Sequence, residues 1–396
     1  MDNDYGNKIE YYLITIMYLF AVTTITAQIF QYTQVISLMI AVIYGLSFFL
    51  LFVTWFQSFD GLDILAIIIL LLSFISVFVD ALMVGKGLSF SYLRKWIMFS
   101  STIVFLTAVR KVEPNQSFIK LVFAGNDFLA VLFIEEFFRQ GKRVYILNKI
   151  VTKYLCFHFT NPNLTAIFLV SIFIMELIEA AESDHTLGKI GHIFLSAFLA
   201  YFINETKSRN GILIILLFVI IYIFTTLFKR KQFKSHKGIA FFIAIYPLIF
   251  ADIYLQIINW ITSKKLFSFM VEAGKSLNSR TRVWEGAVKL FRNSPIFGAY
   301  YEMSGGTGIS QAHNTCLDVL TSYGVIVFAL TVIFLTYILY WNGKKLAEKK
   351  FLYLAAFGCL LLMGTGEAAL FSGGLCIQVV VGIFLALINV KESDAT

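Results

Sequence analysis

The chain has 396 residues, of which 59% are hydrophobic and only 14% are charged, and its mean hydropathy is +0.79. A soluble domain carries roughly 25% charged residues, so this composition excludes an ordinary soluble protein and indicates a membrane protein. The formal net charge of +8 suits contact with anionic lipid headgroups. No segment resembles a nucleic-acid-binding module, so we expect no nucleic-acid partner.

Apolar runs of about 20 residues recur along the whole chain, and each is long enough to cross roughly 30 Å of hydrocarbon as a helix. In lipid such runs must be helical, because every backbone polar group needs an internal partner. The sequence therefore predicts an all-α polytopic membrane protein with about twelve spans. In chain order the predicted spans are Tyr11–Phe30, Val35–Phe56, Leu62–Val84, Trp96–Val109, Ile119–Phe138, Leu164–Ala181, Gly188–Ile203, Gly211–Phe228, Gly238–Ile261, Leu317–Trp341, Phe351–Leu370 and Gly374–Val390.

Three of these spans need comment. The first follows Met1–Glu10, which lacks the basic region and cleavage site of a signal peptide, so we interpret it as a retained span. The fourth is short and is expected to begin before Arg94. The fifth contains four charged residues between Lys120 and Glu136, so a re-entrant or interfacial helix remains an alternative to a span.

Clusters of lysine and arginine give the expected orientation. Basic residues at 229–237 and 344–350 mark cytoplasmic loops, which places both termini in the cytoplasm and the one large loop outside the cell membrane. We expect three parts: a nine-span bundle (residues 1–261), an extracytoplasmic catalytic loop (262–316) and three last spans (317–396). A basic stretch at 139–153 does not fit. Either the fifth segment does not span, or these cations line an external site for an anion.

An apolar stripe in the loop predicts a short helix that begins near residue 279. The residues of the stripe recur on one face of a helix: Val283, Trp284, Ala287, Val288 and Phe291. Ser279 can cap the start, and Asn293-Ser294-Pro295 stops the helix. Arg280 and Arg282 then lie at the helix N-terminus, where free N–H groups and guanidinium donors favour a phosphate. The alternative is an amphipathic surface helix whose arginines contact lipid phosphates.

Further polar residues are expected on the same outer face. His313, followed by Asn314, lies where the loop re-enters the membrane, and a histidine there can take a proton near neutral pH. A structural hydrogen bond is the alternative role for this histidine. Arg209 lies in a polar turn between two spans, and Glu367 lies near the outer end of the eleventh span. The four cysteines show no metal-binding or disulfide spacing, so we expect packing roles for them and no metal site.

Three groups of these residues together resemble the O-antigen ligase and Wzy-type polysaccharide polymerase superfamily. The first is Asn161-Pro162-Asn163 at the start of a middle span, and the second is Ser208-Arg209-Asn210-Gly211 at the start of a later span. The third comprises Arg280, Trp284, Ser294-Pro295-Ile296-Phe297-Gly298, His313-Asn314 and Gly324. The chain departs from the family pattern at Ala299-Tyr300 and at Ser322-Tyr323, which bears on the loop shape and the subfamily.

The resemblance implies a fold like that of O-antigen ligases (GT-C-like) and a metal-independent, inverting glycosyl transfer on the outer face without a cofactor. The implied donor is a glycan on undecaprenyl diphosphate. Arg209 and Arg280 would bind the diphosphate, and His313 would be the general base. The other residues assigned to substrate binding are Arg282, Asn314, Asn163, Trp284 and Glu367.

Within the superfamily we favour a polymerase, which extends a lipid-linked repeat unit, over a ligase, which transfers glycan to a lipid or protein. The preference rests on a Phe-, Ile- and Lys-rich, Pro-poor composition, which suggests an AT-rich genome and an envelope without lipopolysaccharide. A flippase and a chain-length regulator would be its partners, together with membrane lipids. The alternative from another class is a lipid or oligosaccharide transporter, which would place its key residues deep within broken spans.

Overall fold

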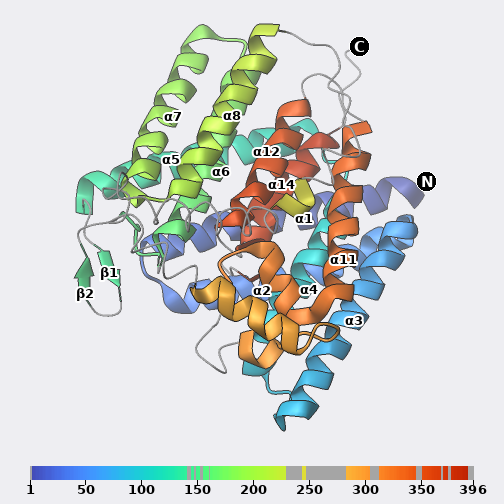
Figure 1. The fold of residues 1–396 in the computed structure, drawn as a ribbon. Coiled ribbons are helices and arrows are strands. Elements are labelled where there is room, and N and C mark those ends of the chain that lie inside the picture. The colour runs from blue at the N-terminus through green and yellow to red at the C-terminus, as the bar shows by residue number, and fades with distance from the viewer. Residues whose placement is uncertain are drawn as a thin grey trace.

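The computed structural model describes residues 2–140, 144–146, 149–151, 155–159, 161–228, 243–246, 282–303, 312–344, 350–366, 369–372 and 376–390. Figure 1 labels its main elements. In chain order they are α1 (Asp2–Ile29), α2 (Thr33–Gln57), α3 (Gly61–Val84), α4 (Phe90–Val109), α5 (Gln116–Gln140), β1 (Val144–Ile146), β2 (Lys149–Val151), α6 (Pro162–Glu182), α7 (Thr186–Thr206), α8 (Arg209–Phe228), α11 (Thr315–Lys344), α12 (Phe351–Leu362), the 3-10 helix η4 (Met363–Thr365), α13 (Ala369–Ser372) and α14 (Ile377–Ile388).

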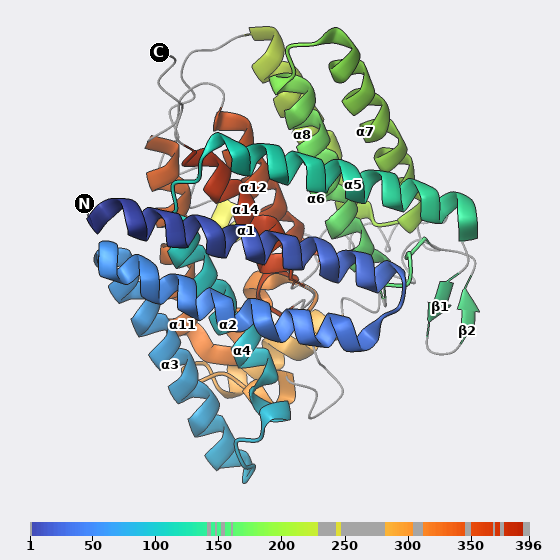
Figure 2. The same ribbon diagram turned by 180° about the vertical axis from the view of Figure 1, so that it is seen from behind.

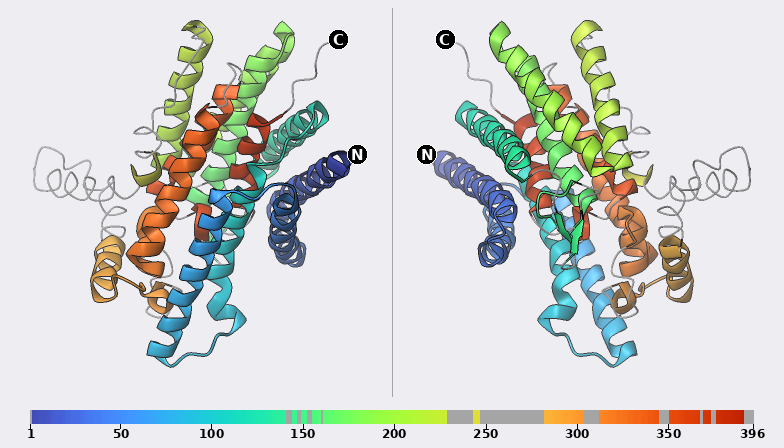
Figure 3. Two further views of the ribbon diagram at one scale, coloured as in Figure 1. Left: turned by 90° about the vertical axis from the view of Figure 1, so that its right-hand side faces the viewer. Right: turned by 90° about the vertical axis from the view of Figure 1, so that its left-hand side faces the viewer.

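The helices run in two directions. The helices α3, α4, α6, α7, α8 and α11 follow the long direction of Figure 1, whereas α1 and α2 and also α5 run across this direction and lie in front of the others in Figure 2. Figure 3 shows α1 and α2 nearly end-on. The crossing helices pack on the others through contacts of α1 with α14 and of α2 with α4. The most buried helices are α6 and α14, while only 22% of the residues in the spanning windows of α7 and α8 are buried. The core therefore lies around α6, α12 and α14, and α7 and α8 present an apolar surface suited to lipid.

Eight of the described helices are long and apolar enough to cross a membrane, which supports the predicted multi-pass membrane protein. They match eight predicted spans, including the fifth, because the helix Gln116–Arg139 is among them. The full count of twelve spans remains a prediction. The predicted ninth span lies outside the described residues except for 243–246, which are helical.

Other predicted spans differ in detail from the structure. The fourth begins at Phe90, before Arg94 as expected, but it is not one of the eight. The eleventh span is predicted to extend from Phe351 to Leu370. Its helix α12 instead ends at Leu362 and is followed by η4 and Gly366. Glycine disfavours a continuous helix because it loses more backbone freedom than other residues. The hairpin of β1 and β2, with Tyr145 opposite Ile150, is an addition to the all-helical prediction.

Contacts between helix ends define two ends of the bundle. Arg110, at the end of α4, pairs with Asp60 before α3 at 2.7 Å, and its carbonyl accepts a hydrogen bond from Asn389 after α14 at 2.8 Å. Lys350, before α12, donates to the carbonyl of Val390 at 2.7 Å. These residues share one end. Because α3 and α4 are antiparallel, the α3–α4 turn lies at the other end, together with residues 282–303. We call this other end the loop end.

Candidate active site

A short helix over residues 282–293 is anchored to the start of α11 by Trp284. The Trp284 side chain is 1% exposed and packs in a small apolar cluster with Ala287, Met303 and Leu317. Its indole N–H donates to the carbonyl of Ala312 at 2.7 Å. The helix ends at Asn293, where the sequence predicts its stop, and Trp284 and Ala287 of its apolar stripe are buried against the protein. The buried indole therefore holds the residue directly before His313.

The turn over residues 294–298 docks on a break in α11. At Gly324 the backbone of α11 leaves the helical region, with φ 83° and ψ 175°. The N–H of Val325 donates to the carbonyl of Pro295 at 2.8 Å, and the N–H of Ala299 donates to that of Thr321 at 2.7 Å. A side chain at Gly324 would collide with the carbonyl of Ile296.

Gly298 is the second glycine of this contact, and it also has a positive φ of 74°. A Cβ at Gly298 would lie 2.6 Å from the carbonyl carbon and oxygen of Ser322. Real Cβ atoms do not approach backbone so closely, and only glycine adopts such backbone angles without strain. The two motif glycines thus allow the turn and the break in α11 to touch, which explains physically why both are glycine in this chain.

His313 and Asn314 form the entry into α11. Asn314 is buried, and its Oδ1 accepts the N–H of Leu317 at 2.9 Å, as expected of a residue that caps a helix. His313 is partly exposed and has φ 49°, a left-handed conformation that costs a residue with a side chain roughly 1–2 kcal/mol. The amide of Asn314, assigned by sequence to substrate, thus has a structural role in the helix cap. The His313 side chain is partly exposed.

Arg209 begins α8 at a turn that contacts two other elements. The hydroxyl of Ser208 accepts the N–H of Gly211 at 3.3 Å, and Asn210 Nδ2 donates to the carbonyl of Met363 at 2.6 Å. A Cβ at Gly211 would lie 3.3 Å from the Cβ of Ala166 in α6. The turn is therefore packed between α6 and η4. The Arg209 side chain is exposed.

Asn161 and Asn163 have different roles at the start of α6. The Asn161 side chain caps the helix by accepting the N–H of Asn163 at 2.8 Å, and Pro162 fits the first turn, where its missing N–H is not needed. Asn163 is partly exposed at the same helix start. Of the two asparagines, Asn163 is thus the one that can face a substrate.

The path of α12 shows on which side of the bundle Arg209 lies. The helix starts at the end opposite the loop, beside Val390, and extends over Phe351–Leu362 toward the loop end, a rise of roughly 18 Å. The 3-10 helix η4, which follows α12, contacts the first turn of α8 through the hydrogen bond from Asn210 to Met363, and it also contacts α11. Arg209 therefore lies on the same side of the bundle as the start of α11. That Arg209 and His313 share one site remains a prediction.

The remaining predicted site residues are only partly described. Arg282 is the first described residue of its helix, and its side chain is exposed. Arg280 and Glu367 lie outside the described residues. Among the described residues the structure therefore brings Trp284, His313 and the Gly324 break into one packed unit, with Arg209 and Asn163 at the same end of the bundle.

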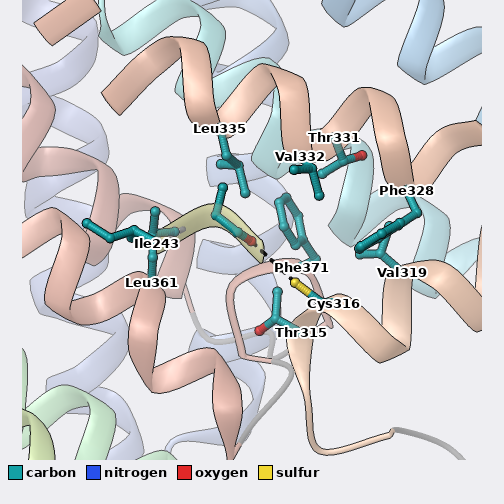
Figure 4. A pocket seen from close by; sticks show the side chains of 11 residues that line it. Ile243, Thr315, Cys316, Val319, Phe328, Thr331, Val332, Leu335, Leu361 and Phe371 are labelled. Atoms are coloured by element: carbon teal, nitrogen blue, oxygen red, sulfur yellow. Dashed lines mark hydrogen bonds between the residues drawn. The ribbon is translucent and has the colours of Figure 1, made fainter. Parts of the chain in front are cut away.

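An apolar pocket lies directly beyond this unit (Figure 4). It lies beside Thr315 and Cys316, and its other walls are mostly apolar side chains of α11, α12, α13 and the helical residues 243–246, among them Leu335, Leu361 and Phe371. The Cys316 thiol donates to the carbonyl of Ala244 at 3.4 Å. All four cysteines are buried and free, as expected for packing residues. The lining suits a hydrocarbon group and offers little to a sugar.

The residues that support the loop from α3 and α4 are not among the predicted site residues. Asp80 accepts the N–H of Tyr301 at 2.7 Å and the hydroxyl of Tyr92 at 2.9 Å. Tyr300 donates to the carbonyl of Tyr92 at 2.7 Å, and burial raises the pKa of Tyr300 above its ordinary value, so its hydroxyl stays protonated. Lys95, in α4, also contacts the loop, because its Nζ donates to the carbonyl of Met303 at 2.9 Å. The only signal in the sequence was the presence of charged and tyrosine side chains at span ends.

One group of described residues has donors that could hold a metal ion. Ligand atoms of Asp127, Glu176 and His192 all lie within 4.8 Å of one another, and His192 Nδ1 is 2.8 Å from Glu176 Oε2. Glu176 is fully buried. Glu176 lies near the end of α6, roughly 20 Å along the helix from Asn163. The group is thus separate from the candidate active site.

Taken together, the apolar helices and the packed polar loop define a multi-pass membrane protein with a candidate site at one end of its bundle. The family model for O-antigen ligase matches residues 194–332 of this chain. The match covers the Arg209 turn, the loop and most of α11, and it begins after Asn161-Pro162-Asn163. It confirms the resemblance to the O-antigen ligase and Wzy-type polymerase superfamily that the motifs indicate. A comparison with curated proteins found no significant match.

Proposed function

We propose that this protein is a membrane polysaccharide polymerase. In this proposal it transfers a growing glycan from undecaprenyl diphosphate to a lipid-linked repeat unit on the outer face of the cell membrane. The observation that carries the proposal is the packing of the loop motif around the start of α11, where Trp284 and Asn314 hold His313 on both sides. The match to the O-antigen ligase family supports glycan transfer as the class of activity.

The chemistry is an inverting displacement. An acceptor hydroxyl oxygen bonds to the anomeric carbon of the donor while the bond from that carbon to the diphosphate oxygen breaks. The diphosphate leaves with the electron pair, and His313 takes the hydroxyl proton, a role that contributes about 10²–10⁴-fold in rate. Arg209 and Arg280 stabilise the charge that develops on the leaving diphosphate. The donor is already activated by its lipid, so no nucleotide or metal ion is required.

The remaining residues have supporting roles in the proposal. Asn163 and Arg282 have side chains that can meet the substrate at the loop end, and Glu367 is assigned to the same substrate. Trp284 is buried, so it acts by positioning the backbone before His313. We place residues 262–316 outside and both termini in the cytoplasm, because the basic segments 229–237 and 344–350 lie toward the other side in the predicted topology.

The acceptor distinguishes a polymerase from a ligase. A polymerase lengthens the lipid-linked glycan, whereas a ligase moves it to a lipid core or a protein. A flippase and a chain-length regulator are the partners we propose for a polymerase. The break after α12 is a feature that transporters also show. Translocation of labelled donor across proteoliposomes without any new glycosidic bond would favour the transporter.

The decisive assay uses purified protein in lipid nanodiscs with an undecaprenyl-diphosphate-linked oligosaccharide, and it measures chain length and released diphosphate lipid. We expect His313→Ala to abolish transfer. Arg280→Lys should reduce it strongly, because lysine keeps the charge but loses the bidentate fork. Arg292→Lys, near the end of the helix over residues 282–293, and His185→Ala, before α7, are the matched controls that should transfer normally. Normal transfer by His313→Ala at equal expression would refute its role.

A further inference from the structure

A buried ion pair lies beside the proposed base. Lys95, in the second turn of α4, places its Nζ 3.1 Å from Oδ1 of Asp318 in the first turn of α11. The two side chains are only 9% and 3% exposed. Because a charge taken out of water is costly unless it is compensated, each of these groups depends on the other.

Both partners also hold the backbone of the loop. Lys95 Nζ donates to the carbonyl of Met303 at 2.9 Å, and Asp318 Oδ1 accepts the N–H of Ala312 at 3.0 Å. Met303 and Ala312 are the described residues on either side of the stretch 304–311. One ion pair therefore fixes the loop backbone at two points that are separated in the chain.

Ala312 is held from both sides. Its N–H donates to Asp318, and its carbonyl accepts the indole N–H of Trp284 at 2.7 Å. The next residue is His313, whose left-handed backbone persists only where the surroundings enforce it. On the other side, Asn314 is fixed by its cap on α11. The conformation of His313 thus depends on contacts made by its neighbours, and the ion pair supplies one of them.

We propose that Lys95 and Asp318 are positioning residues that fix the backbone of His313 and so direct its imidazole toward the acceptor hydroxyl, an inference that rests on the proposed function. A purely stabilising role is the simpler alternative. A buried ion pair is weak support for that alternative, because apolar residues of similar size often stabilise a protein equally well. Placement matters more for catalysis, since a shift of about 1 Å can cost about 10²-fold in rate.

A second buried lysine–aspartate pair, formed by Lys111 just after α4 and Asp63 in α3, serves as the control. Lys111 Nζ lies 2.6 Å from Asp63 Oδ2, and the two side chains are 9% and 0% exposed. Lys111 also donates to a backbone carbonyl, that of Ser58, at 2.6 Å. The two pairs agree in charge and in their contact with a backbone carbonyl, and Asp63 also lies 3.4 Å from Arg110 and accepts the indole N–H of Trp55 at 3.1 Å, so the control variant removes more polar contacts than the test variant. Only the Lys95–Asp318 pair touches the residue before His313.

The test replaces each pair with apolar residues in the full-length protein in nanodiscs, as Lys95→Met/Asp318→Leu and Lys111→Met/Asp63→Leu. We measure the thermal midpoint, hydrogen exchange of peptides that cover residues 312–317, and kcat and KM for the lipid-linked oligosaccharide. For the first variant we expect exchange in 312–314 to rise at least about tenfold and kcat to fall about 10- to 100-fold, with KM within about twofold. The second should leave exchange in 312–314 and kcat unchanged, and Lys95→Arg should retain most of kcat because it keeps the charge and the donors.

Hydrogen exchange tests whether Lys95 and Asp318 fix the backbone of His313 without depending on what the protein catalyses. Unchanged exchange in 312–314 would overturn it whatever the protein catalyses. If His313→Ala is inactive, an unchanged kcat for Lys95→Met/Asp318→Leu would also overturn the inference. An equal loss of kcat in the two apolar double variants would overturn it as well. Normal transfer by His313→Ala would instead contradict the proposed function, while the exchange result still decides the positioning. If the first variant does not fold, Asp318→Asn takes its place, because it removes the charge and keeps the size.

Discussion

Replacing Gly324 with alanine tests the contact between the turn at residues 294–298 and the break in α11. The backbone of Gly324, with φ 83° and ψ 175°, lies in a region that essentially only glycine adopts. Alanine there costs about 1–3 kcal/mol in backbone conformation. Its methyl group would also collide with the carbonyl of Ile296, so the turn must move away.

Moving the turn breaks two hydrogen bonds, from Val325 to Pro295 and from Ala299 to Thr321. Each is worth about 1 kcal/mol. The sum gives a loss of about 3–5 kcal/mol in the free energy of unfolding. We expect Gly298→Ala, on the other side of the contact, to cost a similar amount.

Two other glycines separate the cost of the backbone conformation from the cost of the close approach. Gly85 has φ 69°, but no atom lies within 4 Å of the place that a Cβ would take, so Gly85→Ala should cost only about 1 kcal/mol. Gly45 lies inside α2 with the same open space around it, so Gly45→Ala should be neutral or stabilise by about 0.5–1 kcal/mol. Unfolding in mixed micelles at equal lipid content measures the free energy of unfolding of the Gly324→Ala, Gly85→Ala and Gly45→Ala variants. A Gly324→Ala loss no larger than that of Gly85→Ala would refute the close approach.

Three other predictions concern Trp284, Asp60 and divalent metal ions. Trp284→Phe removes the donor to the carbonyl of Ala312, so we expect a loss of about 1–3 kcal/mol and slower transfer, measured by unfolding and by the oligosaccharide assay. Burial raises the pKa of Asp60, but the hydrogen bond and charge of Arg110 outweigh it and lower the pKa to about 2. The stability from this pair is therefore complete above the unfolded pKa of about 3.9 and is lost as pH falls toward 2, so Asp60→Asn should lower the thermal midpoint at pH 6 and much less near pH 2. Removing divalent metals with EDTA should leave transfer unchanged, because the Asp127–Glu176–His192 group is remote from the candidate site; an EDTA-sensitive rate would contradict the metal-independent mechanism.

Hydropathy and local stop signals predicted most helices well, because the length of an apolar run and its caps are properties of nearby residues. The end of the loop helix at Asn293 and the cap at Asn161 are examples. The end of α12 at Leu362 was missed although Gly364 and Gly366 follow it, since the apolar residues around them outweighed the glycines in the prediction.

The candidate site shows what a single sequence does not contain. The motif residues were recognisable, but the contact of the turn at residues 294–298 with α11 depends on a break at Gly324 inside a helix that looks continuous in hydropathy. Lys95 and Asp318 are 223 residues apart, and nothing local pairs them. Their meeting follows only from the packing of α4 beside the start of α11. Such partners emerge from tertiary structure, whereas the residues they support can be read from the chain.

The central claim is that Arg209, Arg280 and His313 share one site for a lipid-borne diphosphate. An electron cryomicroscopy structure of the protein in nanodiscs with bound undecaprenyl diphosphate tests it most directly. We predict diphosphate oxygens within hydrogen-bonding distance of both guanidinium groups, with the imidazole of His313 facing the side from which an acceptor would approach. A diphosphate bound elsewhere, or the three side chains facing separate surfaces, would contradict the account.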